Sequence, residues 1–145
     1  MNKDLKSLII FLKASSSLER NIKNSLLGTG INISEFTAME ALYHKGPLTT
    51  QELIDTILIS NSSMTYVLEI LEEKNYINRK KKPDDKRVQI LSLSKPGKDF
   101  FREVYNKHFS YMRSIFDVLS NEEEILLQDL LKKLGKKAMK KLRSN

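Results

Sequence analysis

The chain of 145 residues contains no cysteine. That absence excludes disulfides, thiolate metal sites, cysteine nucleophiles and redox sensing through a thiol. Long apolar runs are also absent: no stretch approaches the roughly 18 residues of a membrane-spanning helix, and the N-terminus has neither the apolar core nor the cleavage site of a signal peptide. From these absences we expect a cytoplasmic protein that does not enter a membrane.

The sequence also lacks the residue patterns of common catalytic and cofactor sites. It has no glycine-rich phosphate loop, no Ser/His/Asp set and no carboxylate pair in a catalytic context, which argues against an enzyme. Its two histidines are His44 and His108, and without cysteine or an H-x-x-x-H spacing they favour structural roles over metal binding. We therefore expect neither a metal nor another cofactor.

The residues that are present indicate one ordered domain with a basic surface. Hydrophobic residues make up 40% of the chain and charged residues 30%, which is typical of a folded, mostly helical protein and not of a disordered one. The net charge of +7 favours an anionic partner, and nucleic acid before membrane. The basic residues concentrate in two places, residues 79–87 and 132–143.

Apolar residues at helical spacing, together with capping residues, predict six helices. The first ends at Gly28 and Gly30, since glycine suits the left-handed C-cap position. The predicted helices are residues 4–27, 34–44 with Ser34 as cap, a third from Thr49, 61–74 with Ser60 as cap, 94–119 with Ser94 as cap, and a sixth after a Ser120 cap.

The third predicted helix opens with the capping box Thr49-x-x-Glu52. Its first residues, Thr49, Thr50 and Gln51, offer amides and hydroxyls that suit a phosphate. Its inward-facing side chains are expected to be Leu53, Ile54 and Ile57.

Two faces of the fourth predicted helix differ in character. Met64, Val67, Leu68 and Leu71 fall on one side and are expected to be buried. The opposite side is short, polar and able to form hydrogen bonds, as a helix in a DNA major groove must be. It carries Asn61, Ser62, Thr65, Tyr66 and Glu69.

A basic hairpin follows this helix. Residues 76–79 and 88–93 are predicted as paired strands, and Leu48 as a very short strand. The connection has Pro83, Asp84 and Asp85 near its tip, and six of the ten residues from 78 to 87 are basic. An ordinary solvated hairpin is the alternative, but this charge excess beside a polar helix favours DNA binding.

The two ends of the chain carry long apolar stripes that one small domain would struggle to bury. We expect residues 1–28 and 95–143 to pair with the same segments of a second chain in a symmetric dimer. A monomeric six-helix domain is the alternative. The basic residues after position 132 lie opposite the leucines at helical spacing, which favours a solvated face over a second DNA or membrane patch.

The order of these segments resembles the MarR family of bacterial winged helix-turn-helix regulators over nearly the whole chain. The resemblance is carried by SSMTYVLEILE at residues 62–72, YINR at 76–79, DKR at 85–87 and LSKPG at 93–97. It implies one domain, 1–145: mainly α with a small β-wing, a winged helix-turn-helix part at 32–93, and dimerisation helices at both ends.

The resemblance also implies roles for wing residues. By matching position, Arg87 would enter the minor groove, Asp85 would orient it, and Lys80, Lys81, Lys82 and Lys86 would contact phosphates.

Three positions depart from the usual family pattern. Tyr66 stands where arginine is usual, so the contact made there should differ in kind. Asn75 replaces a glycine, which is tolerable because asparagine accepts the left-handed conformation. Ser94 replaces a threonine cap.

The function expected from both lines of reasoning is a dimeric repressor at a palindromic operator, with a small aromatic or amphipathic ligand as a possible effector. The predicted DNA-binding residues are Thr49, Thr50, Gln51, Ser60, Asn61, Ser62, Ser63, Thr65, Tyr66, Lys80, Lys81, Lys82, Asp85, Lys86 and Arg87. The resemblance implies a ligand pocket, which would draw on Phe11, Phe36, Met39, Tyr43, Met112 and Phe116, although such a stripe is also typical of plain core. A winged-helix module that binds protein and not DNA is the alternative.

Overall fold

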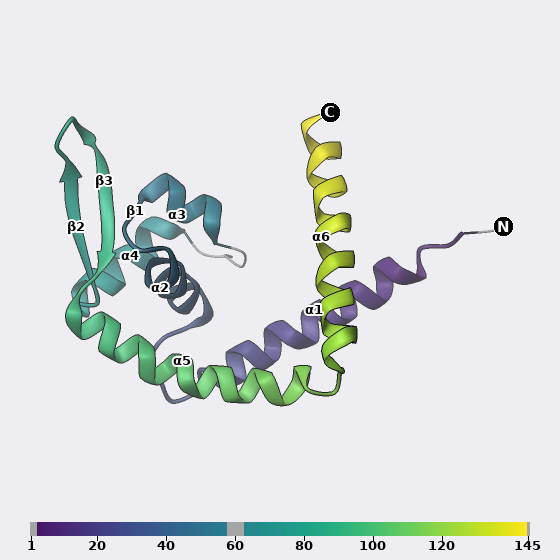
Figure 1. Ribbon diagram of the computed structural model, residues 1–145. Helices are drawn as coiled ribbons and strands as arrows, with labels where there is room; N and C mark the ends of the chain where they lie inside the picture. The colour runs from purple at the N-terminus through teal and green to yellow at the C-terminus, as the bar shows by residue number, and fades with distance from the viewer. Residues whose placement is uncertain (1–2, 58–62, 145) are drawn as a thin grey trace. The chain divides into compact units, whose positions relative to one another are not determined.

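The computed structural model describes residues 3–57 and 63–144. The chain divides into two compact units, Met1–Phe109 and Ser110–Asn145. The predicted fold class, mainly α with a small β-wing, is confirmed (Figure 1). In chain order the elements are α1 Lys6–Ser25, α2 Ile33–Lys45, β1 Leu48–Thr49, α3 Thr50–Thr56, α4 Met64–Glu73, β2 Ile77–Lys82, β3 Asp85–Leu93, α5 Lys95–Phe116 and α6 Asn121–Arg143.

The start of α2 differs from the prediction. Its cap is Asn32, not Ser34: Asn32 Oδ1 accepts a hydrogen bond from the Glu35 amide at 2.8 Å, and Glu35 Oε1 accepts one from the Asn32 amide at 2.9 Å. Both residue types cap helices well, but only the position of Asn32 places a glutamate three residues later to complete the capping box. Ser34 is consequently buried inside the helix.

The capping box at the start of α3 is confirmed. Of the three side chains of this segment that are predicted to face inward, one is exposed. Glu52 donates its amide to Thr49 Oγ1 at 3.1 Å, and the Thr49 amide donates to Glu52 Oε1 at 2.9 Å. Leu53 is fully buried and Ile57 is half-buried, but Ile54 is 45% exposed. A helix of seven residues packs through one narrow side, and Ile54 lies about 100° around from Leu53.

Helix α4 begins at Met64, three residues later than predicted. Ser63, the residue before it, is extended with a ψ of 125°, and its side chain makes no capping bond. Serine is a poor helix former because its side chain competes for backbone hydrogen bonds, which suits Ser63 to a position before the helix. The predicted inward face is confirmed, since Val67, Leu68 and Leu71 are buried and Met64 is half-buried. The predicted cap Ser60 lies outside the described residues, as do Asn61 and Ser62.

The three strands form an antiparallel sheet in the order β1-β3-β2. Ile77 pairs with Leu93 and Lys80 with Ile90, and the register shifts between Lys81 and Lys82. The hairpin ladder is longer than predicted, because β2 continues to Lys82 and β3 begins at Asp85. The tip of the hairpin extends beyond the group of α2, α3 and α4 (Figure 1). Lys80, Lys81, Lys86 and Arg87 are exposed on it.

A compact junction joins the end of α4 to β2 and α5. Asn75 adopts the left-handed conformation that the sequence predicts, with a φ of 62°. Ser94 Oγ donates to the Asn75 carbonyl oxygen at 2.6 Å and accepts from the Gly97 amide at 3.0 Å, which confirms Ser94 as the cap of α5. A Cβ added at Gly97 would overlap the Tyr76 carbonyl oxygen, so only glycine fits there. This junction holds the base of the hairpin against the helices.

The core of the first unit lies between α2, α4, the sheet and the first half of α5. Phe36 and Phe101 are at its centre, with ring centroids 5.4 Å apart. Its buried members are Leu26, Ile31, Phe36, Ala38, Met39, Ala41, Leu42, Leu48, Leu53, Val67, Leu68, Leu71, Ile77, Leu91, Leu93, Phe101 and Val104.

The second unit contains the end of α5 and all of α6. Helix α5 stops at Phe116, three residues before the predicted end, since the chain must turn before Ser120, which is extended and caps α6. The predicted capping box is confirmed: the Ser120 amide donates to Glu123 Oε1 at 2.8 Å. Arg113 joins the two helices through NH2, which lies 2.9 Å from Asp117 Oδ1 and 2.8 Å from Glu124 Oε2.

Candidate nucleic-acid interface

The outer face of α4 presents Thr65, Tyr66 and Glu69, three of the five residues that the sequence predicts there; the other two, Asn61 and Ser62, lie outside the described residues. Ser63, Thr65 and Glu69 are exposed, and Tyr66 is 62% exposed although it is a large aromatic residue. An exposed tyrosine offers both a flat ring and a hydroxyl to a partner. Thus α4 has a buried apolar side and a free hydrogen-bonding side, and the latter is the side available to a DNA groove.

The wing is the β2–β3 hairpin, residues Ile77–Leu93. Lys80, Lys81 and Lys86 are exposed on it, and Lys82 is half-buried. Four lysines on a narrow two-stranded ribbon form a local positive field that attracts a polyanion. The structure therefore presents all four predicted phosphate-contacting lysines to solvent to some extent.

Asp85 and Arg87 form a paired unit at the start of β3. Arg87 Nε donates to Asp85 Oδ1 at 3.1 Å, its NH2 donates to Oδ2 at 3.4 Å, and its backbone amide also donates to Oδ1 at 3.1 Å. These hydrogen bonds, with the charge of Lys82, hold the pKa of Asp85 below its usual value. The Arg87 side chain is nevertheless 91% exposed. Asp85 thus restricts the guanidinium without hiding it.

The start of α3 lies beside the wing. Thr49, Thr50 and Gln51 line a hollow of about 670 Å³ together with Lys82, Lys86 and Arg87. The sheet brings them together, because Thr49 of β1 pairs with Ile90 of β3. Hydroxyls, an amide and three cations thereby converge at one surface, although the two sets are more than thirty positions apart in the chain.

Arg79 is a basic residue of the wing with a different surrounding. Its Nε lies 3.3 Å from Glu72 Oε2 on α4, and its NH1 donates to Gln89 Oε1 on β3 at 3.3 Å. The side chain is only 21% exposed. Arg79 therefore connects α4 to the wing and is less available to a ligand than the exposed lysines of the wing.

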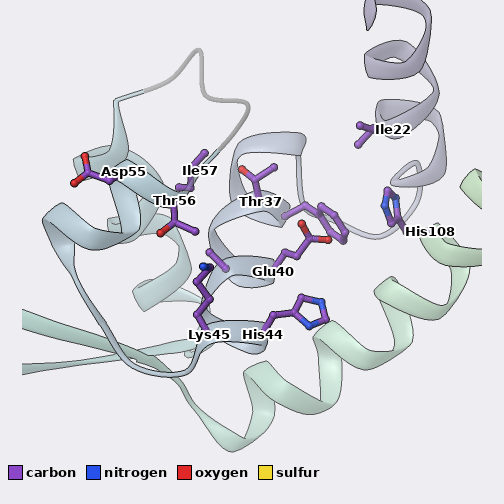
Figure 2. A pocket seen from close by; sticks show the side chains of 11 residues that line it. Ile22, Thr37, Glu40, His44, Lys45, Asp55, Thr56, Ile57 and His108 are labelled. Atoms are coloured by element: carbon purple, nitrogen blue, oxygen red, sulfur yellow. The ribbon is translucent and has the colours of Figure 1, made fainter. Parts of the chain in front are cut away.

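A cavity of about 590 Å³ lies elsewhere in the first unit, between α1, α2, α3 and α5 (Figure 2). The half-buried Glu40 carboxyl has a raised pKa because burial disfavours its charge, and His44 partly opposes that effect. Burial lowers the pKa of His108, whose Nδ1 lies 2.9 Å from Ser25 Oγ. The lining residues are Ile22, Phe36, Thr37, Glu40, Ala41, His44, Lys45, Asp55, Thr56, Ile57 and His108.

The residues predicted for a ligand pocket are spread over several places. Only Phe36 among them lines this cavity. Met39 is fully buried in the core, Tyr43 is half-buried and accepts a hydrogen bond from Arg102 Nε at 3.1 Å, and Phe11 is 42% exposed on α1. Met112 and Phe116 belong to the second unit.

The sequence matches fit this geometry. Residues 31–88, which include α2 to the first part of β3, match the sequence model of the MarR family. The chain is 32% identical over 133 residues to the HTH-type transcriptional regulator MhqR of Bacillus subtilis strain 168, and the alignment covers 92% of each protein. The chain belongs to the MarR family. It is thus a DNA-binding transcription regulator, and its relatives form a class without enzymatic function.

Solved MarR-family structures share the fold. Sco3205 from Streptomyces coelicolor, solved in complex with DNA, superposes with a TM-score of 0.81 at 21% identity, covering 93% of this chain and 89% of that one. NadR, solved in complex with 4-hydroxyphenylacetate, gives a TM-score of 0.76 at 26% identity, covering 92% of this chain and 95% of that one. Members of the family therefore include proteins that bind DNA and proteins that bind a small aromatic molecule.

Within residues 3–57 and 63–144, no helix combines the length and apolar character that crossing a membrane requires. In the same part of the chain, no three His, Asp or Glu residues come together as a metal site would need.

The sequence did not predict the polar residues that line the cavity, Glu40, His44 and His108. Glu40 and His44 are four residues apart on α2, and Phe36 is four residues earlier, so the helical period alone could have grouped them on one face. His108 carries no such signal, since its partner Ser25 is 83 positions away.

Proposed function

We propose that this protein is a homodimeric repressor that binds a palindromic operator and is released from it by a small aromatic or amphipathic ligand. In each subunit, α4 enters a major groove and the wing reaches the adjacent minor groove. The observation that carries the proposal is the Asp85–Arg87 pair, in which a restricted but 91% exposed guanidinium projects from a lysine-rich hairpin. An arginine held in this way suits a narrow, electronegative minor groove.

The hollow between α3 and the wing supports a backbone contact. Thr49, Thr50 and Gln51 can donate hydrogen bonds to phosphate oxygens while Lys82 and Lys86 supply charge. Contacts of this kind position a protein on the duplex, and contacts from Thr65 and Tyr66 of α4 to base edges would then specify sequence. Ser60, Asn61 and Ser62 complete the proposed DNA-contacting set from outside the described residues.

Uncovered apolar faces in both terminal helices support the homodimer. In α1, Leu8, Ile9 and Leu12 are 49%, 55% and 56% exposed. In α6, Leu130 and Leu134 are 54% and 60% exposed, and no described residue of this helix is buried. Apolar stripes of this length are rare on the surface of monomers and mark contact with another chain. A symmetric dimer covers both, and it places two copies of α4 on a two-fold operator.

Selection of bound duplexes from random DNA tests the proposal directly. The full chain is mixed with a randomised duplex library, bound DNA is recovered and sequenced, and the winner is titrated at several salt concentrations. We expect an inverted repeat with half-sites about one helical turn apart. We also expect affinity to fall steeply with salt, because each neutralised phosphate releases counterions.

The alternative function, a winged-helix module that binds protein, gives a different result in the same experiment. Such a module would show no enrichment of any sequence, and its weak DNA binding would be the same for selected and scrambled duplexes. Loss of discrimination between duplexes at every salt concentration would therefore reject the repressor.

A further inference from the structure

The net positive charge of the chain lies in the second half of α6. Residues 132–143 contain seven basic residues and no acidic one. The whole chain has 25 basic and 18 acidic residues, so once these seven are set aside, 18 basic residues remain against 18 acidic ones. Every residue from 128 to 144 is exposed. One short helical segment is therefore the source of the overall charge of +7.

Four of the seven basic residues follow one another at successive turns of α6, and we call them the cationic row: Lys132, Lys136, Lys140 and Arg143. At 3.6 residues per turn they lie within about 80° of one another around the helix axis, and Leu134 lies on the opposite side. The row borders a hollow of about 760 Å³, whose remaining lining residues are Gly135 and Met139. The row is thus one face of the helix and leaves a space between its side chains.

The cationic row is unfavourable for the helix that carries it. Its neighbouring members are like charges three or four residues apart, and such pairs destabilise a helix. In α5, by contrast, Lys95 Nζ lies 3.4 Å from Asp99 Oδ2, four residues later. Within residues 3–57 and 63–144, no member of the row forms a salt bridge. The helix dipole favours cations in the last turn, which explains Lys140 and Arg143 but not Lys132. A negatively charged partner would relieve this repulsion.

The length of the cationic row suits an extended polyanion. Arg143 follows Lys132 by 11 positions, so the row is about 16 Å long at 1.5 Å per residue. One strand of B-DNA carries a phosphate about every 3.4 Å along its axis, so about five phosphates fall within that length. An anionic membrane surface suits α6 less well, because residues 121–143 contain no aromatic residue to anchor the helix there. The helical spacing alone favours a solvated face, but the repulsion within the row and its fit to a phosphate backbone favour DNA.

We propose that the cationic row of α6 binds the phosphate backbone of duplex DNA irrespective of sequence, as a contact surface separate from α4 and the wing. Each cation neutralises a phosphate, and Gly135 leaves room for the nucleic-acid backbone to approach the helix. This contact adds the same affinity on every duplex and leaves sequence discrimination unchanged. It goes beyond the proposed function, since it requires neither an operator nor an effector.

Lysine footprinting on the unmodified full chain tests the contact. The chain is acetylated with and without a duplex of arbitrary sequence, and mass spectrometry measures the modification rate of each lysine. We expect DNA to slow the acetylation of Lys132, Lys136 and Lys140 several-fold, because a lysine held against a phosphate is less reactive. Lys98 and Lys107, exposed on α5, are the controls and should be unaffected. Equal rates for the α6 lysines with and without DNA would overturn the proposal.

The salt dependence of binding tests whether the row acts as a site. Replacing its four members by glutamine, a good helix former, should preserve α6, which circular dichroism verifies. We expect the slope of log affinity against log salt concentration to become shallower by about 3 to 4, since each phosphate contact contributes about 0.9.

A variant with the same loss of charge at scattered, exposed positions of α1 and α5 is the matched control: Lys13→Gln, Arg20→Gln, Lys98→Gln and Lys107→Gln. Its slope should be nearly that of the unmodified chain. Equal slopes in the two variants would assign the effect to overall charge and reject a site on α6. If the α6 variant loses helicity, the footprint on the unmodified chain decides.

Vesicles of phosphatidylglycerol distinguish a lipid partner from DNA. The footprint is repeated with these vesicles and, as a control, with vesicles of phosphatidylcholine. We expect the duplex to protect the α6 lysines more strongly than either vesicle, because α6 has no aromatic anchor. Protection by phosphatidylglycerol that exceeds the protection by DNA would overturn the DNA assignment in favour of a membrane surface.

Failure of the proposed repressor has a separate signature. Arg87→Ala should weaken binding to the selected duplex and leave the protection of α6 intact. The glutamine variant of the row should instead lower the affinities for selected and scrambled duplexes by the same factor. Protection of α6 in a chain that selects no sequence would refute the repressor and leave the α6 contact standing. Selection of an operator by a chain whose α6 lysines stay unprotected would do the reverse.

Discussion

Asp85 holds Arg87 by three hydrogen bonds within one strand, two from the guanidinium and one from the backbone amide, while leaving the guanidinium exposed. The pair behaves as a preorganised contact: the carboxylate limits the rotamers of a long side chain, so less conformational entropy is lost when the arginine enters a groove. The hydrogen bonds from Arg87 lower the pKa of Asp85 and so favour the charged carboxylate that holds the arginine.

Replacing Arg87 by alanine should weaken binding to the selected duplex by roughly 1–3 kcal/mol without changing the fold, because the side chain is exposed and its partner Asp85 can be solvated. Fluorescence anisotropy with a labelled duplex at fixed salt measures the change. Arg20→Ala, an exposed arginine of α1, is the control and should have little effect. An unchanged isotherm for Arg87→Ala would rule out the wing contact.

Replacing Tyr66 by alanine should reduce discrimination between the selected and a scrambled duplex by about tenfold, since the residue is 62% exposed on the outer face of α4. Tyr66→Phe separates the contribution of the ring from that of the hydroxyl. Affinities of both variants for both duplexes are compared at one salt concentration. If each variant retains the full ratio, Tyr66 does not read sequence.

Lys74 connects the end of α4 to the start of α2. Its Nζ lies 3.2 Å from Glu35 Oε2 and donates to the Gly30 carbonyl oxygen at 2.9 Å, and the Glu35 side chain is only 6% exposed. Lys74→Met keeps the aliphatic stem but leaves a buried carboxylate without its cation, so the free energy of unfolding should fall by about 1.5–3 kcal/mol. Urea denaturation measures it, and Lys98→Met at an exposed position of α5 is the control. Equal stability of the two variants would show that this pair contributes nothing.

The stability of the protein should fall below about pH 6.5 in part because of His108. The folded chain binds a proton at His108 only at lower pH than the unfolded chain does, since burial lowers the pKa in the fold. Between those two pKa values the unfolded state binds more protons, so the free energy of unfolding decreases as the pH falls. His108→Asn should flatten this dependence when denaturation is measured from pH 8 to pH 5. The same slope in the variant would assign the effect to other groups.

Introducing charge into the apolar side of α6 should dissociate the proposed dimer. Leu130 and Leu134 are 54% and 60% exposed, so a Leu130→Glu, Leu134→Glu double variant should fold as a single chain but lose its partner. Sedimentation velocity measures the mass, and Lys133→Glu on the same helix is the control, expected to remain dimeric. A double variant that sediments like the unmodified chain would exclude α6 from the interface.

The confirmed features of the fold are local in origin. The period of the apolar residues in α4, the capping boxes at Thr49 and Ser120, and the left-handed Asn75 each depend on side chains within a few positions of one another. The errors arose where two nearby candidates competed for one role. Asn32 and Ser34 can both cap α2, and a run of polar residues obscured the start of α4.

The candidate DNA-binding site likewise has features that the sequence predicts and features that only the structure shows. Residues 79–87 form a basic run in the sequence, and the family resemblance distinguishes Asp85 and Arg87 within it. The sequence did not indicate that Arg79, unlike the other basic residues of the wing, contacts neighbouring side chains of the fold. Its partners are Glu72 on α4 and Gln89 on β3, which the packing of α4 against the hairpin brings close to it.

The sequence by itself determined the helices, the polar face of α4 and the basic wing, because these follow from short-range periodicity, capping and charge. The regulator family was indicated by the resemblance of short motifs and not by these patterns. Only the tertiary structure decided that Thr49 to Gln51 lie beside the wing, and that Ser25 forms a hydrogen bond with His108, 83 positions away. Hydrogen bonds between distant segments depend on how the helices pack, and packing is a property of the whole core.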